Sequence, residues 1–147
     1  WSRSATTTDM RRRLKSKGCL LKVRMDKKEI SLHGFIDTGC TITEPFSGLS
    51  VVICNRKKLF ELLDRPALLD KKNEDVLVCA DDELKKRLRL VPFQTVGAKS
   101  ALLAVRPDSA AVIMGRRENN INCFLGAGDE DIKETGFDAI LPPDLIN

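Results

Sequence analysis

The sequence predicts a mainly β fold, in the form of a small barrel or sandwich with one or two short helices. Apolar residues occur in many short runs bounded by turn residues, which is typical of strands, and no internal repeat is visible. The chain has 147 residues, the length of a single domain, and 42% of them are hydrophobic, enough to bury a core. No apolar run reaches the roughly 18 residues that a transmembrane helix needs, so we expect this chain to be soluble.

The first expected elements follow one another closely. Residues 19–25 and 29–36 are two β runs separated by three charged residues, a spacing that suits a hairpin. After a turn cluster, residues 50–54 are expected to form a third strand. Residues 56–63 have the apolar spacing of a short helix that ends before Pro66.

The middle of the chain is more polar. Residues 71–75 are expected to form a charged surface loop. A second short helix is expected at 83–88, capped by Asp81 or Asp82, because acidic side chains stabilise the N-terminus of a helix.

The last third of the chain returns to a β pattern. Residues 90–95 and 101–105 flank a turn at 96–100 and are expected to form a second hairpin. Further strands are expected at 110–114, 122–125 and 137–141, and a final helical turn at 142–144, since proline is tolerated at the start of a helix.

Cysteine and histidine usage argues against a metal centre. The five cysteines form no CxxC pair, and His33 is the single histidine, so we expect no metal site. The thiols are interpreted as small core side chains in a reduced, cytosolic compartment. His33 lies off the inward face of its strand and is expected to be structural or exposed, not catalytic. The aromatic residues expected in the core are Phe46, Phe60, Phe93, Phe124 and Phe137.

The sharpest chemical signal is Asp37-Thr38-Gly39, directly after an apolar strand. The strand would fix the Asp37 carboxylate, Thr38 would hold the loop through its hydroxyl, and Gly39 would let the backbone approach a substrate. An aspartic protease needs two such carboxylates that share one proton, one acting as base toward water and the other as donor to the scissile carbonyl. The tripeptide alone is also compatible with an aspartate that merely caps a turn.

Over residues 18–147, the chain resembles the retropepsin-like aspartic proteases, and among them the C-terminal protease domain of the sporulation pro-sigma-E processing peptidases. The most specific stretches are GFIDTGCTITEPFSGLSVVIC (34–54), VPFQTVGAKSALLAVRPD (91–108) and FDAILPPDLI (137–146). This resemblance implies a small closed retropepsin-like (acid-protease) barrel that works as a two-fold symmetric homodimer.

The resemblance makes Asp37 the catalytic residue and the turn at 96–100 a mobile flap over the substrate. The chain departs from the common pattern at Pro142, where retropepsins usually have glycine, although proline is a feature of the sporulation group. It also has Cys40 where that group more often has asparagine, which implies an altered loop contact. The substrate-binding residues implied by the resemblance are Thr38, Gly39, Val96, Gly97 and Ala98, and no cofactor is implied.

One catalytic aspartate per chain predicts a dimer. The sequence has a single DTG and no DSG, so a dyad requires two copies of Asp37 to meet at a two-fold axis. Asp138 is a conceivable partner within the chain, but no Thr-Gly follows it, and an isolated aspartate at a strand edge is ordinarily solvated.

Basic charge gathers at the N-terminal end. Residues 1–24 hold eight basic residues and one acidic residue, a net charge of +7, which leaves −3 for the rest of a chain whose total is +4. A nucleic-acid partner is not expected, because it favours a basic body with aromatic residues for stacking. Residues 1–17 are interpreted as a linker ahead of the protease domain at 18–147, with a solvated charged tail as the alternative. In the resembled proteins a membrane domain precedes the protease, so this basic segment fits the cytoplasmic side of a membrane.

The resemblance implies an aspartic endopeptidase that removes the pro-sequence of a sporulation sigma factor. It places the full-length protein in the mother-cell membrane with the protease domain on the cytoplasmic side, and it suggests a protein activator as a further partner. The alternative is a catalytically inactive retropepsin-fold dimer that binds a protein partner, with Asp37 in a structural role.

Overall fold

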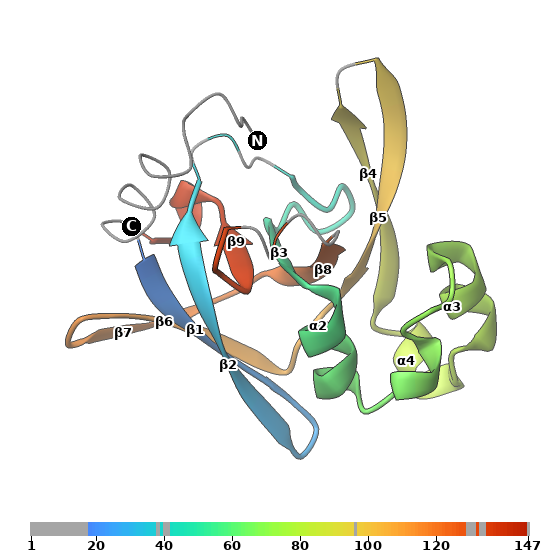
Figure 1. The fold of residues 1–147 in the computed structure, drawn as a ribbon, viewed down its shortest axis with the longest axis horizontal. Coiled ribbons are helices and arrows are strands. Elements are labelled where there is room, and N and C mark those ends of the chain that lie inside the picture. The colour runs from blue at the N-terminus through green and yellow to red at the C-terminus, as the bar shows by residue number, and fades with distance from the viewer. Residues whose placement is uncertain are drawn as a thin grey trace.

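The computed structural model describes residues 18–37, 39, 42–95, 97–128, 132 and 135–146, with the backbone only for residues 94, 95, 98 and 146. Within this part of the chain, nine strands form one sheet and short helices lie beside it (Figure 1). The predicted mainly β fold is therefore confirmed.

The bounds of the elements are as follows. The strands are β1 (Gly18–Met25), β2 (Lys28–Ile36), β3 (Val51–Asn55), β4 (Leu88–Thr95), β5 (Ala98–Val105), β6 (Ser109–Met114), β7 (Arg117–Ile121), β8 (Phe124–Gly128) and β9 (Ala139–Leu141). The helices are α2 (Arg56–Leu63), α3 (Asn73–Cys79) and α4 (Asp82–Lys85), and the 3-10 turns are η1 (Pro66–Leu68) and η2 (Pro143–Ile146).

The strand order of the sheet is β4-β5-β8-β3-β9-β2-β1-β6-β7. Antiparallel hairpins join β1 to β2, β4 to β5 and β6 to β7. The short strand β9 lies in the middle of the sheet, parallel to β2 and antiparallel to β3. The C-terminal part of the domain therefore lies beside β2, the strand that precedes Asp37.

The sheet is open, which differs from the closed barrel that we expected. Its edge strands, β4 and β7, do not pair with each other. The β4–β5 hairpin joins the rest of the sheet only near its base, where Ala104 and Val105 pair with Gly126 and Leu125. Figure 1 shows this hairpin rising away from the β6–β7 hairpin. Because the two edge hairpins diverge, no hydrogen-bonded ladder among the described strands closes the sheet.

Helix α2 supplies much of the main core and has the bounds that the sequence predicts. The Asn55 side chain caps it by accepting hydrogen bonds from the backbone N–H groups of Lys57 and Lys58, at 2.9 and 3.3 Å. Asp64 ends the helix in the left-handed conformation, with φ of 57°. The buried side chains of the helix are Leu59, Phe60, Leu62 and Leu63. They pack with residues of β1, β2, β3 and β8 in one cluster.

Several predicted elements are confirmed, one prediction is wrong and one strand was missed. The hairpins β1–β2 and β4–β5, strand β3 and the final turn η2 occur where expected. The predicted surface loop at 71–75 instead leads into α3, and strand β7 was not predicted at all. Helix α3 buries only Val76 and β7 buries no side chain fully, so neither has the apolar periodicity that sequence analysis depends on.

The helix expected at 83–88 is shorter than predicted. It is the four-residue α4, and Leu88 already belongs to β4. Of the two proposed caps, Asp81 is the one used, because its carboxylate accepts a hydrogen bond from the Leu84 N–H at 2.9 Å.

The expected aromatic and thiol core is only partly correct. Phe60 and Phe124 are buried, and Phe93 and Phe137 are half-buried, but the Phe46 side chain is 93% exposed. Among the cysteines described, Cys54 and Cys123 are buried, Cys19 is half-buried and Cys79 is exposed. Phe46 is exposed because it lies in a tight turn that bends away from the core.

A candidate active site at the end of strand β2

Asp37 immediately follows β2, at the point where β2 runs beside β9. The two strands are parallel, and Gly34, Phe35 and Ile36 pair with Ala139, Ile140 and Leu141. The backbone N–H of Asp37 donates to the carbonyl of Leu141 at 3.0 Å. Because Leu141 is fully buried, this bond ties Asp37 to the interior of the sheet.

The Asp37 side chain is held by its own loop. Its Oδ1 accepts a hydrogen bond from the Gly39 N–H at 2.9 Å, which is the geometry of an Asx turn. Asp37 is half-buried and Gly39 is exposed, so the carboxylate lies near the surface, just beyond the buried Gly34 and Phe35 of β2. Such a carboxylate is fixed in direction yet accessible to a substrate or to a second copy of the chain. The side chains of Thr38 and Cys40 fall outside the described residues.

Close packing beneath the loop fixes the spacing of β2 and β9. A Cβ atom placed on Gly34 would lie 2.5 Å from Cδ1 of Leu141, so this position requires glycine for space. On the same pair of strands, Phe35 and Ile140 pack with Ile132 in a separate small cluster. The Phe35 ring meets Phe137 edge to face, with the ring centroids 5.3 Å apart. The base of the Asp37 loop is therefore rigid.

The predicted flap corresponds to the tip of the β4–β5 hairpin. Thr95 pairs with Ala98, so the strands extend further than expected and the turn is shorter than 96–100. Gly97 has φ of 83°, a positive value typical of a tight hairpin tip. Val96 falls outside the described residues, and only the backbone of Ala98 is described. Of the predicted site residues described, Asp37 and Gly39 are brought together, whereas Gly97 lies on a hairpin that projects from the body (Figure 1).

Asp138 lies at the opposite end of β9 from Asp37. Its backbone N–H donates to the His33 carbonyl at 2.7 Å, and its Oδ2 accepts from the His33 N–H at 3.3 Å. His33 precedes Asp37 by four residues on an extended strand, a separation of roughly 13 Å at ~3.3 Å per residue. Asp138 therefore does not reach Asp37 within one chain. The His33 side chain is exposed, as predicted.

A buried carboxylate that the sequence analysis missed shapes the segment after the motif. Glu44 is only 2% exposed, and its Oε2 accepts hydrogen bonds from the Phe46 and Ser47 N–H groups, each at 2.8 Å, and from Ser47 Oγ at 3.0 Å. The Ser47 N–H contributes most to holding the pKa of Glu44 below its usual value, with the Ser47 hydroxyl and the Phe46 N–H adding to the effect. An acidic residue directly before Pro-Phe-Ser-Gly is the signal that could have revealed this turn.

The C-terminal turn η2 is fastened to the same region. Asp144 Oδ2 accepts a hydrogen bond from Ser50 Oγ at 2.7 Å, just before β3 begins. The segment that follows β9 is therefore linked to the segment that follows the Asp37 motif. This link holds both chain segments around the candidate site in place.

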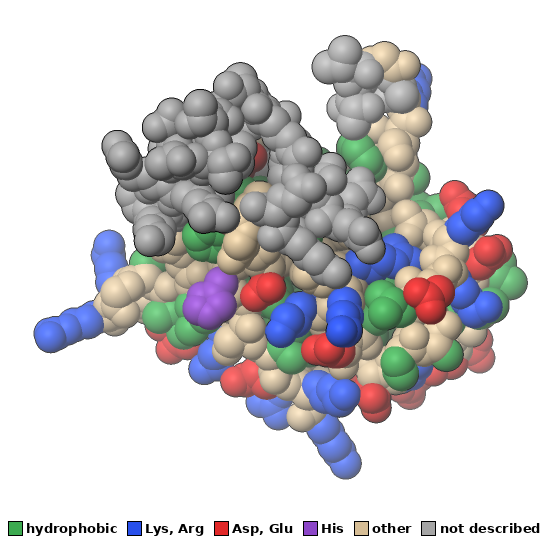
Figure 2. Space-filling model, in the orientation of Figure 1, with side chains coloured by type: hydrophobic (Ala, Val, Ile, Leu, Met, Phe, Trp, Pro, Cys, Tyr) green, Lys and Arg blue, Asp and Glu red, His purple; other side chains and the backbone are tan. Residues whose placement is uncertain are grey.

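The described ranges contain neither a metal-binding cluster nor a membrane-spanning helix. No three His, Cys, Asp or Glu side chains there gather closely enough to hold a metal ion. No helix within these ranges is long and apolar enough to cross a membrane. In Figure 2, the described part of one face carries Lys and Arg side chains interspersed with Asp and Glu.

Comparison with known proteins gives the family. The peptidase family described as "Sporulation factor SpoIIGA" matches residues 2–145, nearly the whole chain. The chain belongs to this family. The resemblance inferred from the sequence is thereby confirmed, and the match also includes most of the basic segment at 1–17.

Two curated proteins are similar to this member of the SpoIIGA family. One is named sporulation sigma-E factor-processing peptidase, from Priestia megaterium (strain ATCC 12872 / QMB1551), and is 28% identical over 86% of this chain and 43% of its own length. The other, from Bacillus thuringiensis subsp. kurstaki, is named as a candidate sporulation sigma factor-processing peptidase and is 32% identical over 86% of this chain and 82% of its own length. The chain thus spans less than half of the first relative. No solved structure matches.

Proposed function

We propose that this protein is an aspartic endopeptidase that removes the pro-sequence of a sporulation sigma factor, using a dyad formed by Asp37 from two copies of the chain. The observation that carries the proposal is the placement of Asp37 in the Asp-Thr-Gly motif at the end of the central strand β2. Its backbone is tied to Leu141 and its carboxylate is held by Gly39. Membership of a peptidase family supports the same conclusion.

Two carboxylates at a two-fold axis supply both an acid and a base. Like charges a few ångströms apart cannot both ionise cheaply, so the pair keeps one proton. The ionised carboxylate takes a proton from water while the water oxygen attacks the scissile carbonyl carbon, and the protonated partner donates its proton to the carbonyl oxygen. In the second step the C–N bond of the intermediate breaks, and the carboxyl group that took the proton from water donates it to the leaving nitrogen. Its partner recovers a proton from the intermediate's hydroxyl, which restores the pair.

The dimer follows from the number of aspartates that the site needs. Asp138 lies at the far end of β9, and the sequence has no second Asp-Thr-Gly or Asp-Ser-Gly. The second carboxylate therefore comes from another copy, in a symmetric interface where each Asp37 loop faces its twin. The half-buried position of Asp37 at a strand end is compatible with such an approach.

The projecting β4–β5 hairpin would act as the flap. Its tip, with Val96, Gly97 and Ala98, would cover an extended peptide whose other side faces Thr38 and Gly39. A positive φ at Gly97 allows a tight tip whose backbone groups can approach the substrate. Closure of such a hairpin would exclude water from the dyad during the reaction.

The substrate is assigned from the names of the two relatives, which refer to processing of sporulation sigma factors. The proposal includes a tether to the mother-cell membrane with the protease domain on the cytoplasmic side, because the basic segment at 1–17 has the charge that favours that side. An activator protein is part of this proposal, because a dimer of separate chains can be controlled through its assembly.

A cleavage assay with a pro-sigma factor tests the proposal. Asp37→Ala and Asp37→Asn are each expected to abolish cleavage, because neither can serve as base or acid. Asp138→Asn is the matched control: its amide oxygen can still accept the His33 N–H bond, so cleavage is expected to persist. Unchanged cleavage by both Asp37 variants would contradict the catalytic role. A wild-type dimer that binds the sigma factor without cutting it would instead indicate a binding module.

Mixed dimers test the shared dyad directly. If subunits exchange freely and half of all protomers carry Asp37→Asn, about one quarter of the dimers keep two aspartates, so the rate is expected to fall to about one quarter at constant total protein. A fall to only one half would mean that each protomer works alone. Sedimentation under the same conditions checks that the dimer forms.

A further inference from the structure

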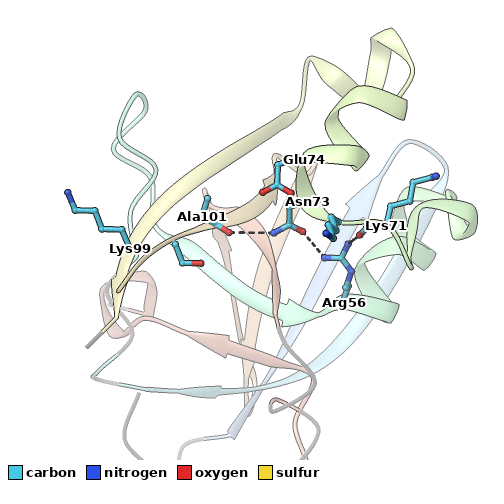
Figure 3. A pocket seen from close by; sticks show the side chains of 8 residues that line it. Arg56, Lys71, Asn73, Glu74, Lys99 and Ala101 are labelled. Carbon is cyan, nitrogen blue, oxygen red and sulfur yellow. Dashed lines mark hydrogen bonds between the residues drawn. The ribbon is translucent and has the colours of Figure 1, made fainter. Parts of the chain in front are cut away.

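An open, basic hollow lies beside the β4–β5 hairpin, on the side of the helices. Its volume is about 680 Å³, and it is bounded by Lys99, Ser100 and Ala101 of β5 and by the chain around the start of α3. Figure 3 shows Lys99 at one end, Lys71 at the other and Asn73 between them. We call this hollow the basic groove.

The groove carries an excess of positive charge. Arg56, Lys71, Lys72 and Lys99 line it, with Glu74 as the acidic residue among its lining side chains. The three lysines are exposed, and none of them forms an ion pair with a residue in the described part of the chain. Their charges are therefore available to a partner.

Arg56 builds the wall of the groove. Its guanidinium donates to the Leu69 carbonyl at 3.0 Å, to Asn73 Oδ1 at 2.9 Å and to the Lys71 carbonyl at 2.7 Å. These bonds fix the backbone of residues 69–73, so Lys71 and Lys72 extend from a segment that is held in place (Figure 3). The backbone of this wall would therefore lose little conformational entropy when a partner binds.

The opposite wall is a strand edge with free pairing capacity. β5 pairs with β4 along its whole length, but on its other side it pairs with β8 only at Ala104 and Val105. Asn73 Nδ2 donates to the Ala101 carbonyl across the groove, at a long 3.4 Å. This bond shows that the Ala101 carbonyl points into the groove. Since backbone groups alternate along a strand, those of Lys99 point the same way.

The other edge of the hairpin is protected. Pro92 of β4 lies opposite Ala101 and has no N–H to offer, which is a common way of blocking an edge strand. The hairpin therefore accepts an added strand more readily along β5 than along β4. The open edge is the one that faces the start of α3, where Lys71 and Lys72 precede Asn73.

We propose that the basic groove binds an extended acidic segment of the protein substrate, which adds to β5 as a strand while its carboxylates meet Lys71, Lys72 and Lys99. Strand addition supplies backbone hydrogen bonds, and the charges supply selectivity for acidic sequences. Assigning the segment to the substrate rests on the proposed protease function. A nucleic acid fits less well, because none of the described residues that line the groove has an aromatic side chain to stack on bases.

Fluorescence anisotropy with the Asp37→Asn protein measures this binding without any cleavage. The probe is a labelled ten-residue peptide of alternating Glu and Thr, and its twin has Gln in place of Glu. We expect the acidic peptide to bind in a salt-dependent manner and the Gln peptide to bind at least about tenfold more weakly. A labelled ten-residue oligothymidylate serves as the nucleic-acid probe, and tighter, lysine-dependent binding of that probe would overturn the proposal.

The matched variants keep the change in net charge equal. Lys71→Glu, Lys72→Glu and Lys99→Glu together are expected to weaken binding of the acidic peptide at least about tenfold. Lys27→Glu, Lys85→Glu and Lys86→Glu together, at exposed positions outside the groove, are expected to leave it within about twofold. Equal affinity of the two triple variants would overturn the proposal, and thermal unfolding of both checks that they fold.

Peptide N-methylation tests the added strand without changing the protein. Methyl groups on alternate amides in one register would block the bonds to β5, whereas those in the other register would point away. We expect one methylated peptide to lose binding and the other to keep it. Similar affinity of both would contradict strand addition.

The cleavage assay then tests the link to the substrate. With Asp37 intact, a variant that carries only Lys71→Glu and Lys72→Glu, both outside the flap hairpin, is expected to raise the KM for the pro-sigma factor while leaving kcat unchanged. Lysine-dependent peptide binding with an unchanged KM would overturn the assignment to the substrate. Absence of any Asp37-dependent cleavage would instead defeat the protease proposal and leave the binding result intact, so the two failures are distinguishable.

Discussion

The backbone N–H of Asp37 donates to the Leu141 carbonyl at 3.0 Å, although the two residues are far apart in the sequence. Leu141 ends the short strand β9, which lies between β2 and β3 in the middle of the sheet. The candidate catalytic loop is thus positioned by the last strand of the chain. Changes at the β2–β9 contact are expected to affect both stability and the site.

Gly34→Ala is expected to destabilise the protein by about 1–3 kcal/mol, because the new Cβ would lie 2.5 Å from Leu141 Cδ1. Leu141→Ala alone is expected to cost about 2–5 kcal/mol as a core truncation. In the double variant the clash is removed, so the combined loss is expected to be smaller than the sum. Urea unfolding of the parent, the two single variants and the double variant measures this coupling. Strictly additive losses in the free energy of unfolding would contradict the close contact.

Glu44 is expected to make stability depend on pH at the acidic end. Its folded pKa lies below the usual value of 4.5, so its stabilising effect is complete above that value and is lost as the pH falls through the lower folded pKa. Glu44→Gln removes the charge-assisted bonds to the 46–47 turn and is expected to be less stable at neutral pH. Thermal unfolding between pH 7 and pH 3 should show that the difference in melting temperature between the parent protein and the Glu44→Gln variant shrinks toward low pH. A constant difference would contradict the shifted pKa.

Two phenylalanines provide a matched test of burial. Phe60→Ala is expected to cost about 3–5 kcal/mol, because the ring is fully buried on the inner face of α2. Phe46→Ala is expected to stay within about 0.5 kcal/mol of the parent, since the ring is 93% exposed. Denaturant unfolding measures both. A large loss at Phe46 would show that its ring is buried in solution, for instance between two copies of the chain.

The buried thiols are expected to resist alkylation. Burial raises the pKa of Cys123 to about 12 and that of Cys54 well above its usual value, so both remain protonated thiols at pH 8. Iodoacetamide labelling followed by peptide mass mapping should modify the exposed Cys79 in the native protein. Cys54 and Cys123 should be modified only in denaturant. Native labelling of Cys123 at the rate of Cys79 would contradict the described core.

Local patterns were sufficient for the elements that bury one clear face. Helix α2 has the bounds predicted from its apolar spacing, and the β1–β2 hairpin follows from two β runs and a short polar turn. The exposed strand β7 and the one-sided helix α3 have no such pattern, so they could not be predicted. Phe46 was assigned to the core by its chemistry, whereas the buried Glu44 carboxylate holds it in an exposed turn.

The sequence by itself determined the mainly β class, the helix α2 and the Asp-Thr-Gly motif as the candidate site, because each depends on residues close together in the chain. Only the tertiary structure decided the rest: that β9 lies between β2 and β3 and holds Asp37 through Leu141, that Asp138 lies too far away to be its partner, and that the sheet stays open. These features arise from pairing between distant segments. Such pairing depends on register and on packing around Gly34 and Leu141, which no local pattern of residue types encodes.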